Sequence, residues 1–375
     1  MKIAVTTLVF CVAALLALGM VMLYSSSMTQ VGAHYLIMQS IWCALGLGFC
    51  VMAIFADYQW LRKLAWPLFL VTILLLFMVL VPHFGLRING ARRWFDFHGL
   101  RFQPSELAKL VLIIILAWYG DRYQRKMGTW KRGVLIPAIF VGVMLGLVFV
   151  EPDRGTTVLL AAVAGTMLLI AGVRWKYIIP PAFLGLVGLT ISILHDPMRM
   201  RRIFSWLDLE EHKSGTGYQA YQAMLALGSG GWTGLGLGNG RQKLGFVPEH
   251  HTDFIFSIIG EELGLVATLL IIAAFLVIIL CGLYIALHAN DTFGLLLGTG
   301  ITFLIGLQAF INIGVVTSAL PNKGLPLPFI SYGGSNLLIM LASTGILLSI
   351  ARHARPGQVY AGSTRSHRIP SSDLP

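Results

Sequence analysis

The densest group of side chains suited to acid–base chemistry is the segment PEHHTDF at 248–254, which directly precedes an apolar run. A carboxylate such as Asp253, placed where an apolar helix begins, can act as a general base on a hydroxyl group. Burial there would raise the pKa of the carboxyl, whereas nearby arginines would lower it. Asp253 could equally be the N-cap of that helix, a common role for aspartate. The spacing leaves both interpretations open.

A second acidic turn, EPDRGT at 151–156, joins two apolar runs. Its Asp153 could cap the following helix or take part in binding, and the sequence favours neither role. Because oxygen ligands and phosphates suit a hard cation, Glu249, Asp153 or Asp253 could share Mg²⁺ or Mn²⁺ with a diphosphate. His251 follows another histidine without the HExxH spacing, so zinc is the less favoured hypothesis. The pattern itself requires no cofactor.

Glu106 and Lys109 lie three positions apart within an apolar run, so they share one helix face and can form an ion pair. Ionisable residues are costly inside a membrane-spanning helix and therefore mark functional positions. We interpret this pair as an orienting one in which Lys109 can also reach a phosphate. Ser105 follows Pro104 at the expected helix start, where an anion is favoured.

Two further segments are rich in glycine or proline. The stretch 228–240 lacks the GxxxxGK[ST] pattern, so its glycines indicate tight turns rather than a nucleotide-binding loop. The stretch 321–336, PNKGLPLPFISYGGSN, contains Lys323 and Ser331. Irregular backbone of this apolar kind is tolerated at membrane depth only when it is buried in protein or lines a cavity. We therefore predict a re-entrant element that shapes the site, and not a plain external loop.

The elements that must position these residues follow from composition. Apolar residues make up 57% of the 375 residues and charged residues 11%, whereas a soluble domain has about 25% charged residues. This excludes a soluble enzyme and predicts an all-α integral membrane protein. Runs suited to spanning helices of about 20 residues occupy roughly 4–24, 36–56, 64–82, 106–120, 134–150, 156–173, 178–195, 255–287, 293–318 and 330–351.

The distribution of Lys and Arg predicts the topology. Short loops rich in both residues fall on one side if the ten helices alternate, which places both termini in the cytoplasm. We expect one polytopic domain over 1–355, a disordered tail over 356–375 and a long extracytoplasmic loop over about 196–253. The outer loops also carry cations, which suits an anionic lipid head group in a membrane. Because no basic run is interleaved with aromatic residues, nucleic acid is not expected as a partner.

Several of these segments resemble the SEDS family of cell-wall polymerases, whose members include FtsW and RodA. The resemblance covers nearly the whole chain. It is carried by NGARRWF (89–95), FQPSELAKL (102–110), EPDRGT (151–156), GYQAYQAMLALGSGG (217–231), PEHHTDFIF (248–256), GEELGL (260–265) and LPNKGLPLPFISYGGSN (320–336). The first and last of these motifs are more similar to the division type, FtsW, than to the elongation type, RodA.

The resemblance implies an inverting glycosyltransferase of the bacterial inner membrane that polymerises lipid II for division, with Asp253 as the catalytic residue. It also implies a class B penicillin-binding protein, a transpeptidase, as partner, along with other division proteins. The expected substrate-binding residues are Arg92, Arg93, Ser105, Glu106, Lys109, Asp153, Gln219, Lys243, His251, Lys323 and Ser331. Alternatives are a lipid II flippase, a RodA-like polymerase, or a non-catalytic division scaffold.

Overall fold

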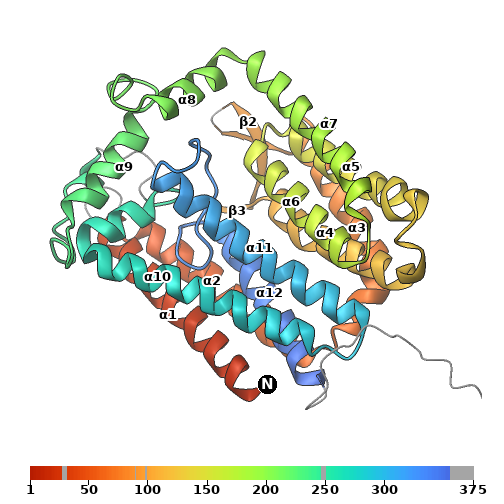
Figure 1. Ribbon diagram of the computed structural model, residues 1–375. Helices are drawn as coiled ribbons and strands as arrows, with labels where there is room; N and C mark the ends of the chain where they lie inside the picture. Colours follow the sequence, from red (N-terminus) through yellow and green to blue (C-terminus); the bar gives the residue numbers. More distant parts are fainter. Residues whose placement is uncertain (28–31, 89, 98, 246–250, 355–375) are drawn as a thin grey trace, which may run out of the picture.

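The computed structural model describes residues 1–354 except 28–31, 89, 98 and 246–250. Its body is a bundle of long helices (Figure 1). These helices are α1 (Lys2–Ser27), α2 (His34–Phe55), α3 (Gln59–Leu80), α4 (Pro104–Arg122), α5 (Ile136–Val150), α6 (Arg154–Ile170), α7 (Trp175–Leu194), α10 (Ile255–Leu287), α11 (Thr292–Val316) and α12 (Gly334–His353).

Each predicted apolar run corresponds to one of these helices, so the prediction of an all-α integral membrane protein is confirmed. In the described ranges, eight helices are long and apolar enough to cross a membrane by themselves. The other two, α4 and α6, are packed between neighbouring helices: α4 carries Glu106 and Lys109 on a largely buried surface, and α6 is shorter. The predicted disordered tail lies outside the described residues.

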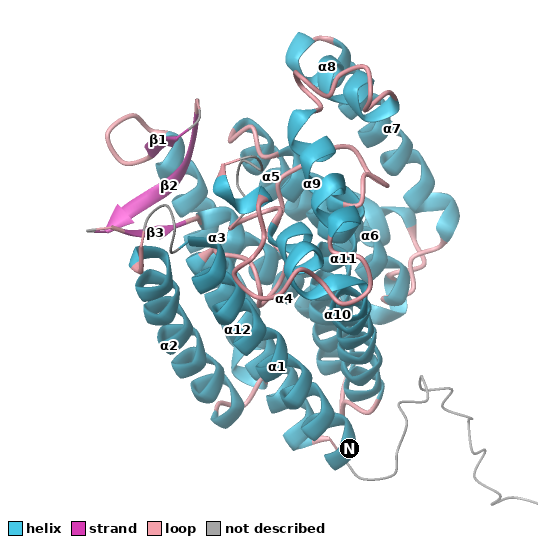
Figure 2. Cartoon of the chain, turned by 90° about the vertical axis from the view of Figure 1, so that its left-hand side faces the viewer, coloured by secondary structure: helices cyan, strands magenta, loops and turns pink. Residues whose placement is uncertain are grey.

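One element was not predicted: a small antiparallel sheet between α3 and α4 (Figure 2). It contains β1 (Leu86–Ile88), β2 (Ala91–Phe97) and β3 (Leu100–Phe102) in the order β1-β2-β3. Asp96 lies opposite Arg101, and opposite charges at such cross-strand positions are stabilising. The Asn-Gly pair at 89–90 is the sequence signal for a hairpin turn that could have indicated this sheet.

The bundle has two different ends. The sheet end carries β1–β3, the short helices α8 (Pro197–Leu207) and α9 (Tyr218–Ser229), and the loop 317–333 (Figure 1). The terminal end carries the start of α1 and the end of α12, and there an ion pair joins Arg62 to Asp121 with N···O 2.9 Å. Helix α7 lies at the edge of the bundle and has no buried residue. The helices therefore present their irregular connections mainly at the sheet end.

The long helix α10 is interrupted at Gly264, where φ is 79° and ψ is −176°. The glycine-rich loop packs into this break: the amides of Leu235 and Gly236 donate to the carbonyls of Glu261 and Glu262, both at 2.9 Å. The predicted tight turns are present, since Gly231, Gly234, Gly236 and Gly238 have positive φ, and these turns pack against α10.

Substitution of Gly264 by alanine is expected to destabilise the protein by about 3 kcal/mol or more, because its backbone conformation is almost exclusive to glycine. A Cβ at this position would also collide with the main chain of Trp232 and Gly234. Thermal unfolding in detergent measures the loss. Gly188→Ala on α7 is the matched control, since a Cβ there meets open space. Equal midpoints for the two variants would show that the break does not depend on glycine.

Candidate functional site

The loop between α11 and α12 folds back into the bundle at the sheet end. Leu325, Leu327 and Phe329 are buried. A Cβ on Gly19 of α1, eight residues before the helix end, would lie 2.7 Å from the Cα of Ile330. Eight helical residues correspond to about 12 Å, so the loop reaches well below the ends of the helices. This agrees with the predicted re-entrant element.

Two amides on one face of α11 hold this loop in place. Gln308 Nε2 donates to the carbonyl of Pro326 at 2.8 Å. Asn312 Nδ2 donates to the carbonyls of Leu325 at 2.7 Å and Asp253 at 2.8 Å. Because residues i and i+4 are neighbours on a helix surface, the two amides act as a pair of clamps. Asn312 thereby ties the segment that carries Asp253 to the loop.

The ion pair predicted from sequence supports this clamp. Lys109 Nζ lies 2.8 Å from Glu106 Oε2 and donates to Gln308 Oε1 at 2.9 Å. All three side chains are buried. The orienting role is therefore visible in the structure, since the pair fixes the amide that holds Pro326. The phosphate contact of Lys109 stays a prediction, and the burial of its ammonium means that a ligand would need a rearrangement to reach it.

Asp253 lies at the sheet end directly before α10. The helix begins at Ile255, its N-cap is Phe254, and that cap makes no side-chain hydrogen bond. The hypothesis that Asp253 is the N-cap is therefore wrong. Its carboxylate instead lies against Gly324, where an added Cβ would collide with Oδ2. A residue without a side chain at 324 is what gives the carboxylate its place beside the re-entrant loop.

The N-terminus of α6 adjoins the same loop from the other side. A Cβ on Gly155 would lie 3.5 Å from the carbonyl oxygen of Gly324. Asp153 caps α6 by accepting from the Thr156 amide at 3.1 Å and from its hydroxyl at 2.9 Å. The capping hypothesis for Asp153 is confirmed, and the cap fixes where α6 begins. Gln103 donates to Ser105 Oγ at 2.8 Å, so the buried Ser105 supports this corner of the bundle.

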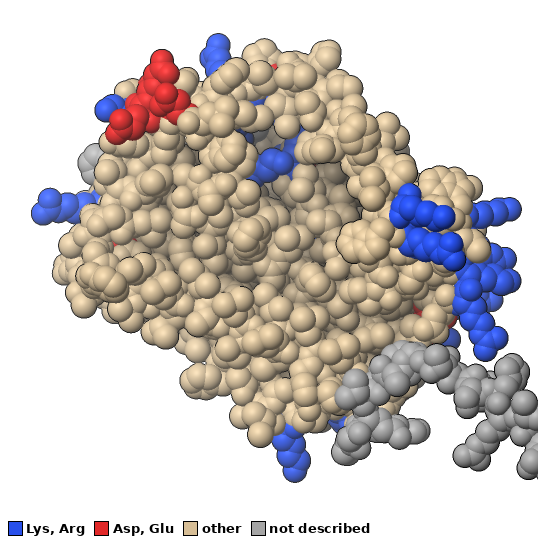
Figure 3. All heavy atoms as spheres, viewed as in Figure 1, with Lys and Arg blue, Asp and Glu red and all other residues tan. Residues whose placement is uncertain are grey.

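Three cations gather around Gly324 and the start of α6. Burial is the main cause that lowers the pKa of the Lys323 ammonium, and the nearby Arg154 and Arg199 lower it further, while Asp153 raises it. Arg154 Nε and Nη1 are buried and make no hydrogen bond to the described residues. Arg199 is held by Asp196 at 3.0 Å. Figure 3 shows a hollow in this face, between the α11–α12 loop and the α6 side, with Lys or Arg atoms in its wall.

Asp196 and Asp153 offset part of this positive charge, and a bound anion would stabilise the cluster further. A diphosphate has the matching charge, and guanidinium groups bind phosphate oxygens well. Arg154 and Arg199 were not among the predicted site residues. The signal that could have found Arg154 is its position at a helix start within EPDRGT, next to a residue already singled out.

Glu151 is a buried carboxyl in the turn between α5 and α6, and neither of its oxygens accepts a hydrogen bond from the described residues. Burial, with a contribution from Asp153, raises its pKa from 4.5 to about 8, although Arg93 opposes the shift. Arg93 donates to the main-chain carbonyls of Glu151 at 2.8 Å and Pro152 at 2.7 Å. Arg93 therefore attaches the sheet to this turn. Its contact with substrate stays a prediction.

Glu151 is expected to contribute a loss of stability as the pH rises from about 4.5 to about 8. In that range folded Glu151 keeps its proton while the unfolded chain releases it, so the free energy of unfolding falls by up to about 1.4 kcal/mol per pH unit. Glu151→Gln should remove this component, as measured by thermal unfolding between pH 5 and 8. Exposed Glu210→Gln is the control. An unchanged slope in the Glu151 variant would mean that this carboxyl is ionised when folded.

The remaining predicted residues make mainly structural contacts among the described ones. Lys243 is buried and pairs with Glu262 at 2.6 Å. Ser331 Oγ accepts from the Leu327 amide at 2.8 Å, which closes a turn of the loop. The His251 ring stacks on Tyr35 with centroids 4.5 Å apart.

Gln219 on α9 accepts from Asn322 at 3.4 Å, so α9 touches the loop beside Lys323. Arg92 lies opposite Arg87 in the sheet. Substrate contacts by Lys243, Ser331, His251, Gln219 and Arg92 stay predictions.

The metal hypothesis finds no ligand cluster in the described part of the chain, where no three His, Cys, Asp or Glu residues come together. Both oxygens of Asp153 are engaged in the cap of α6. These residues therefore do not form a protein-only metal site. Sharing of Mg²⁺ or Mn²⁺ between a diphosphate and Asp253 or Asp153 stays a prediction.

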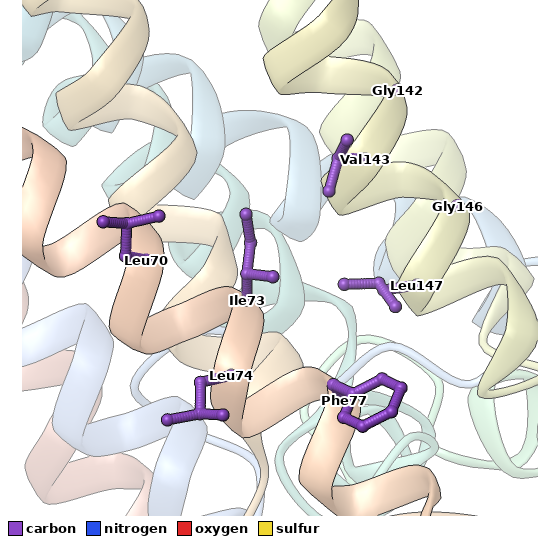
Figure 4. Close-up of a pocket in the computed structure, with 8 residues that line it drawn as sticks. All are labelled: Leu70, Ile73, Leu74, Phe77, Gly142, Val143, Gly146 and Leu147. Atoms are coloured by element: carbon purple, nitrogen blue, oxygen red, sulfur yellow. The ribbon is translucent and has the colours of Figure 1, made fainter.

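An apolar groove lies apart from this site, between α3 and α5 (Figure 4). It has a volume of about 550 Å³, and Gly142 and Gly146 leave room for it because they lack side chains. With no ionisable group in its wall, it offers a surface for lipid chains but no chemistry. Its lining residues are Leu70, Ile73, Leu74, Phe77, Gly142, Val143, Gly146 and Leu147.

Known proteins share both this sequence and this arrangement. Curated relatives named probable peptidoglycan glycosyltransferase FtsW include one from Geobacter metallireducens, 42% identical over 90% of this chain and 92% of its own length. Another, from Coxiella burnetii, is 40% identical over 92% and 95%.

Among solved structures, Thermus thermophilus RodA matches with TM-score 0.70 and 29% identity over 92% of this chain and 96% of its own. A chain from work on polymerization and crosslinking by a peptidoglycan synthase complex matches with TM-score 0.78 and 31% identity over 92% and 96%. The family described as "Cell cycle protein" (FtsW, RodA and SpoVE) matches residues 6–356. The chain therefore belongs to the FtsW/RodA/SpoVE family of multi-pass membrane proteins.

Proposed function

We propose that this chain is a peptidoglycan glycosyltransferase of the division type, which polymerises lipid II into glycan strands and releases undecaprenyl diphosphate. The observation that carries the proposal is the position of the Asp253 carboxylate. It lies against Gly324 of the re-entrant loop. Gly324 also adjoins the start of α6, where Arg154 lies close to Lys323. A carboxylate base and a diphosphate-binding group thus flank one short segment of backbone.

The arrangement supports a single inverting displacement. Asp253 accepts the proton of the 4-hydroxyl of an incoming lipid II, and that oxygen forms a bond to C1 of the sugar at the end of the growing strand. The bond from C1 to the diphosphate breaks, and its electron pair passes to the diphosphate oxygen. Arg154 and Lys323, with Arg199 nearby, offset the negative charge that develops on this leaving group. Diphosphate is a good leaving group, so no strong acid is needed.

The proposal places the sheet end outside the bacterial inner membrane and both termini in the cytoplasm, at the division septum. The loops of the terminal end carry Arg62, Lys63, Arg122, Arg125, Lys126, Lys131 and Arg132, which is the pattern of cytoplasmic loops. A lipid-linked substrate would then meet Asp253 from the outer leaflet. The partner in this proposal is a class B penicillin-binding protein that crosslinks the strands, together with other division proteins.

The test is reconstitution of the purified chain with its partner transpeptidase and labelled lipid II. Appearance of long glycan strands in an electrophoretic assay is the expected result. Movement of labelled lipid II between leaflets without polymer would support the flippase alternative instead. Depletion in cells distinguishes the type: filaments with unfinished septa indicate division, and rounded cells indicate elongation.

A further inference from the structure

A polar pocket lies at the terminal end, between the end of α4 and the start of α5, at the opposite end of the bundle from Asp253. Its volume is about 480 Å³. Figure 3 shows Lys and Arg gathered at this edge of the molecule, where Figure 1 places the segment between α4 and α5. Four cations line the pocket: Arg122, Arg125, Lys126 and Arg132.

These cations are not neutralised by the described part of the protein. The acidic residue of the pocket, Asp121, is paired with Arg62 from α3 at 2.9 Å. Within the described residues, no carboxylate oxygen lies within 4 Å of a cationic nitrogen of the four. Arg122 and Arg132 are held instead by aromatic faces, with the Arg132 guanidinium carbon 4.7 Å from the centre of the Tyr123 ring. A ring face leaves the N–H donors of a guanidinium free for an anion.

The backbone around the pocket is fixed. α5 is preceded by a π-helical turn, Lys131–Leu135, and such turns occur frequently at functional sites. Within this turn Gly133 packs so closely on the carbonyl of Met127 that a Cβ would collide with it. Tyr119 Oη donates to the carbonyl of Arg132 at 2.8 Å. The backbone between α4 and α5, which carries the cations, therefore has a defined conformation.

Two tryptophans indicate the level of the membrane at which the pocket lies. Trp130 in the connection is 45% exposed, and Trp175 at the start of the adjacent α7 is 69% exposed. Exposed tryptophans at the ends of spanning helices are typical of the head-group level of a membrane. A phosphate at that level, carried by a lipid, would meet the pocket without leaving the bilayer.

We propose that this pocket binds the phosphate of an anionic phospholipid head group from the adjoining leaflet. The shape and charge fit this chemistry, since basic pockets between spanning helices bind such head groups. The site is separate from the polymerase site and does not depend on the proposed reaction. Its lipid would hold the ends of α4 and α5 together, and the opposite ends of these helices carry Glu106 and Glu151.

The experiment titrates the purified full-length protein in detergent with phosphatidylglycerol or phosphatidylcholine and counts bound lipids by native mass spectrometry. Arg125→Gln with Lys126→Gln is expected to weaken the tightest phosphatidylglycerol site about tenfold or more. The control is Lys63→Gln with Arg352→Gln, which removes the same charge outside the pocket. The unsubstituted protein should also lose phosphatidylglycerol as salt rises, because the interaction is ionic.

The proposal would be overturned by equal affinity in the pocket and control variants, by equal affinity of the unsubstituted protein for the two lipids, or by phosphatidylglycerol binding that does not depend on salt. Displacement of phosphatidylglycerol by millimolar inorganic phosphate would show that the pocket binds a free anion. That result would also contradict the proposal that its ligand is a lipid. Polymerase activity of the pocket variant, measured in parallel, reports whether it is folded. If that variant does not fold, the comparison of lipids and of salt on the unsubstituted protein decides the question.

Discussion

Replacement of Asp253 by asparagine is expected to reduce lipid II polymerisation by about 10²–10⁴-fold, the range that general-base catalysis contributes. Asparagine keeps the size of the side chain but cannot accept the proton of the acceptor hydroxyl. The hydrogen bond that the Asn312 side chain donates to the main-chain carbonyl of Asp253 does not involve the Asp253 carboxylate, so the fold should persist. Strand formation by the variant with its partner transpeptidase measures the loss, and binding of lipid II in a pull-down should be retained.

The control for charge is Asp208→Asn, which removes an exposed carboxylate near the end of α8 at the same end of the bundle. A second variant, Gly324→Ala, leaves Asp253 intact and tests its position. The added Cβ would displace the carboxylate, so a substantial loss of activity is expected although the base is present. Full activity of Asp253→Asn would show that another group accepts the proton, and full activity of Gly324→Ala would show that the placement beside the loop is unimportant.

The membrane-spanning architecture was predictable because long apolar runs can be read directly. The ion pair of Glu106 and Lys109 followed from helical spacing in the same way. Hydropathy does not reveal breaks in the backbone of a helix, however. The interruption of α10 at Gly264 depends on a loop, about 30 residues earlier in the chain, that packs into it. That distant contact explains why the sequence indicates the turns of the glycine-rich stretch but not the helix against which they pack.

The site was predicted in part. Asp253, Asp153 and Lys323 were selected by residue type, and the structure brings the segments that carry them to one loop. Asn312 was not predicted because it carries no charge, although a buried amide inside an apolar helix also needs a hydrogen-bond partner. Lys243 was expected to contact substrate. The sequence could not show that it is buried against Glu262, since this pairing depends on how η3 (Gln242–Leu244) packs on α10.

The cations beside the start of α6 lead to the second large effect. Arg154→Gln and Lys323→Gln are each expected to lower kcat/KM for lipid II by about 10²-fold, since each removes a charge that stabilises the departing diphosphate. Arg201→Gln on α8 is the matched control, because Arg201 is an exposed cation at the same end. Lys323→Arg should restore part of the activity if charge is what matters, although the fork of arginine does not reproduce an ammonium.

The role of these cations can be separated from that of the base. In the Asp253→Asn background turnover is slowed by about 10²–10⁴-fold, so competition by undecaprenyl diphosphate for bound lipid II, measured before polymer forms, reports diphosphate recognition by itself. Arg154→Gln and Lys323→Gln should each weaken this competition, whereas Arg201→Gln should not. If the competition is unchanged while kcat/KM still falls, the two cations position the loop around Gly324 instead of holding the diphosphate. The Asn312 and Gln308 clamps would then be the part of the molecule through which they act.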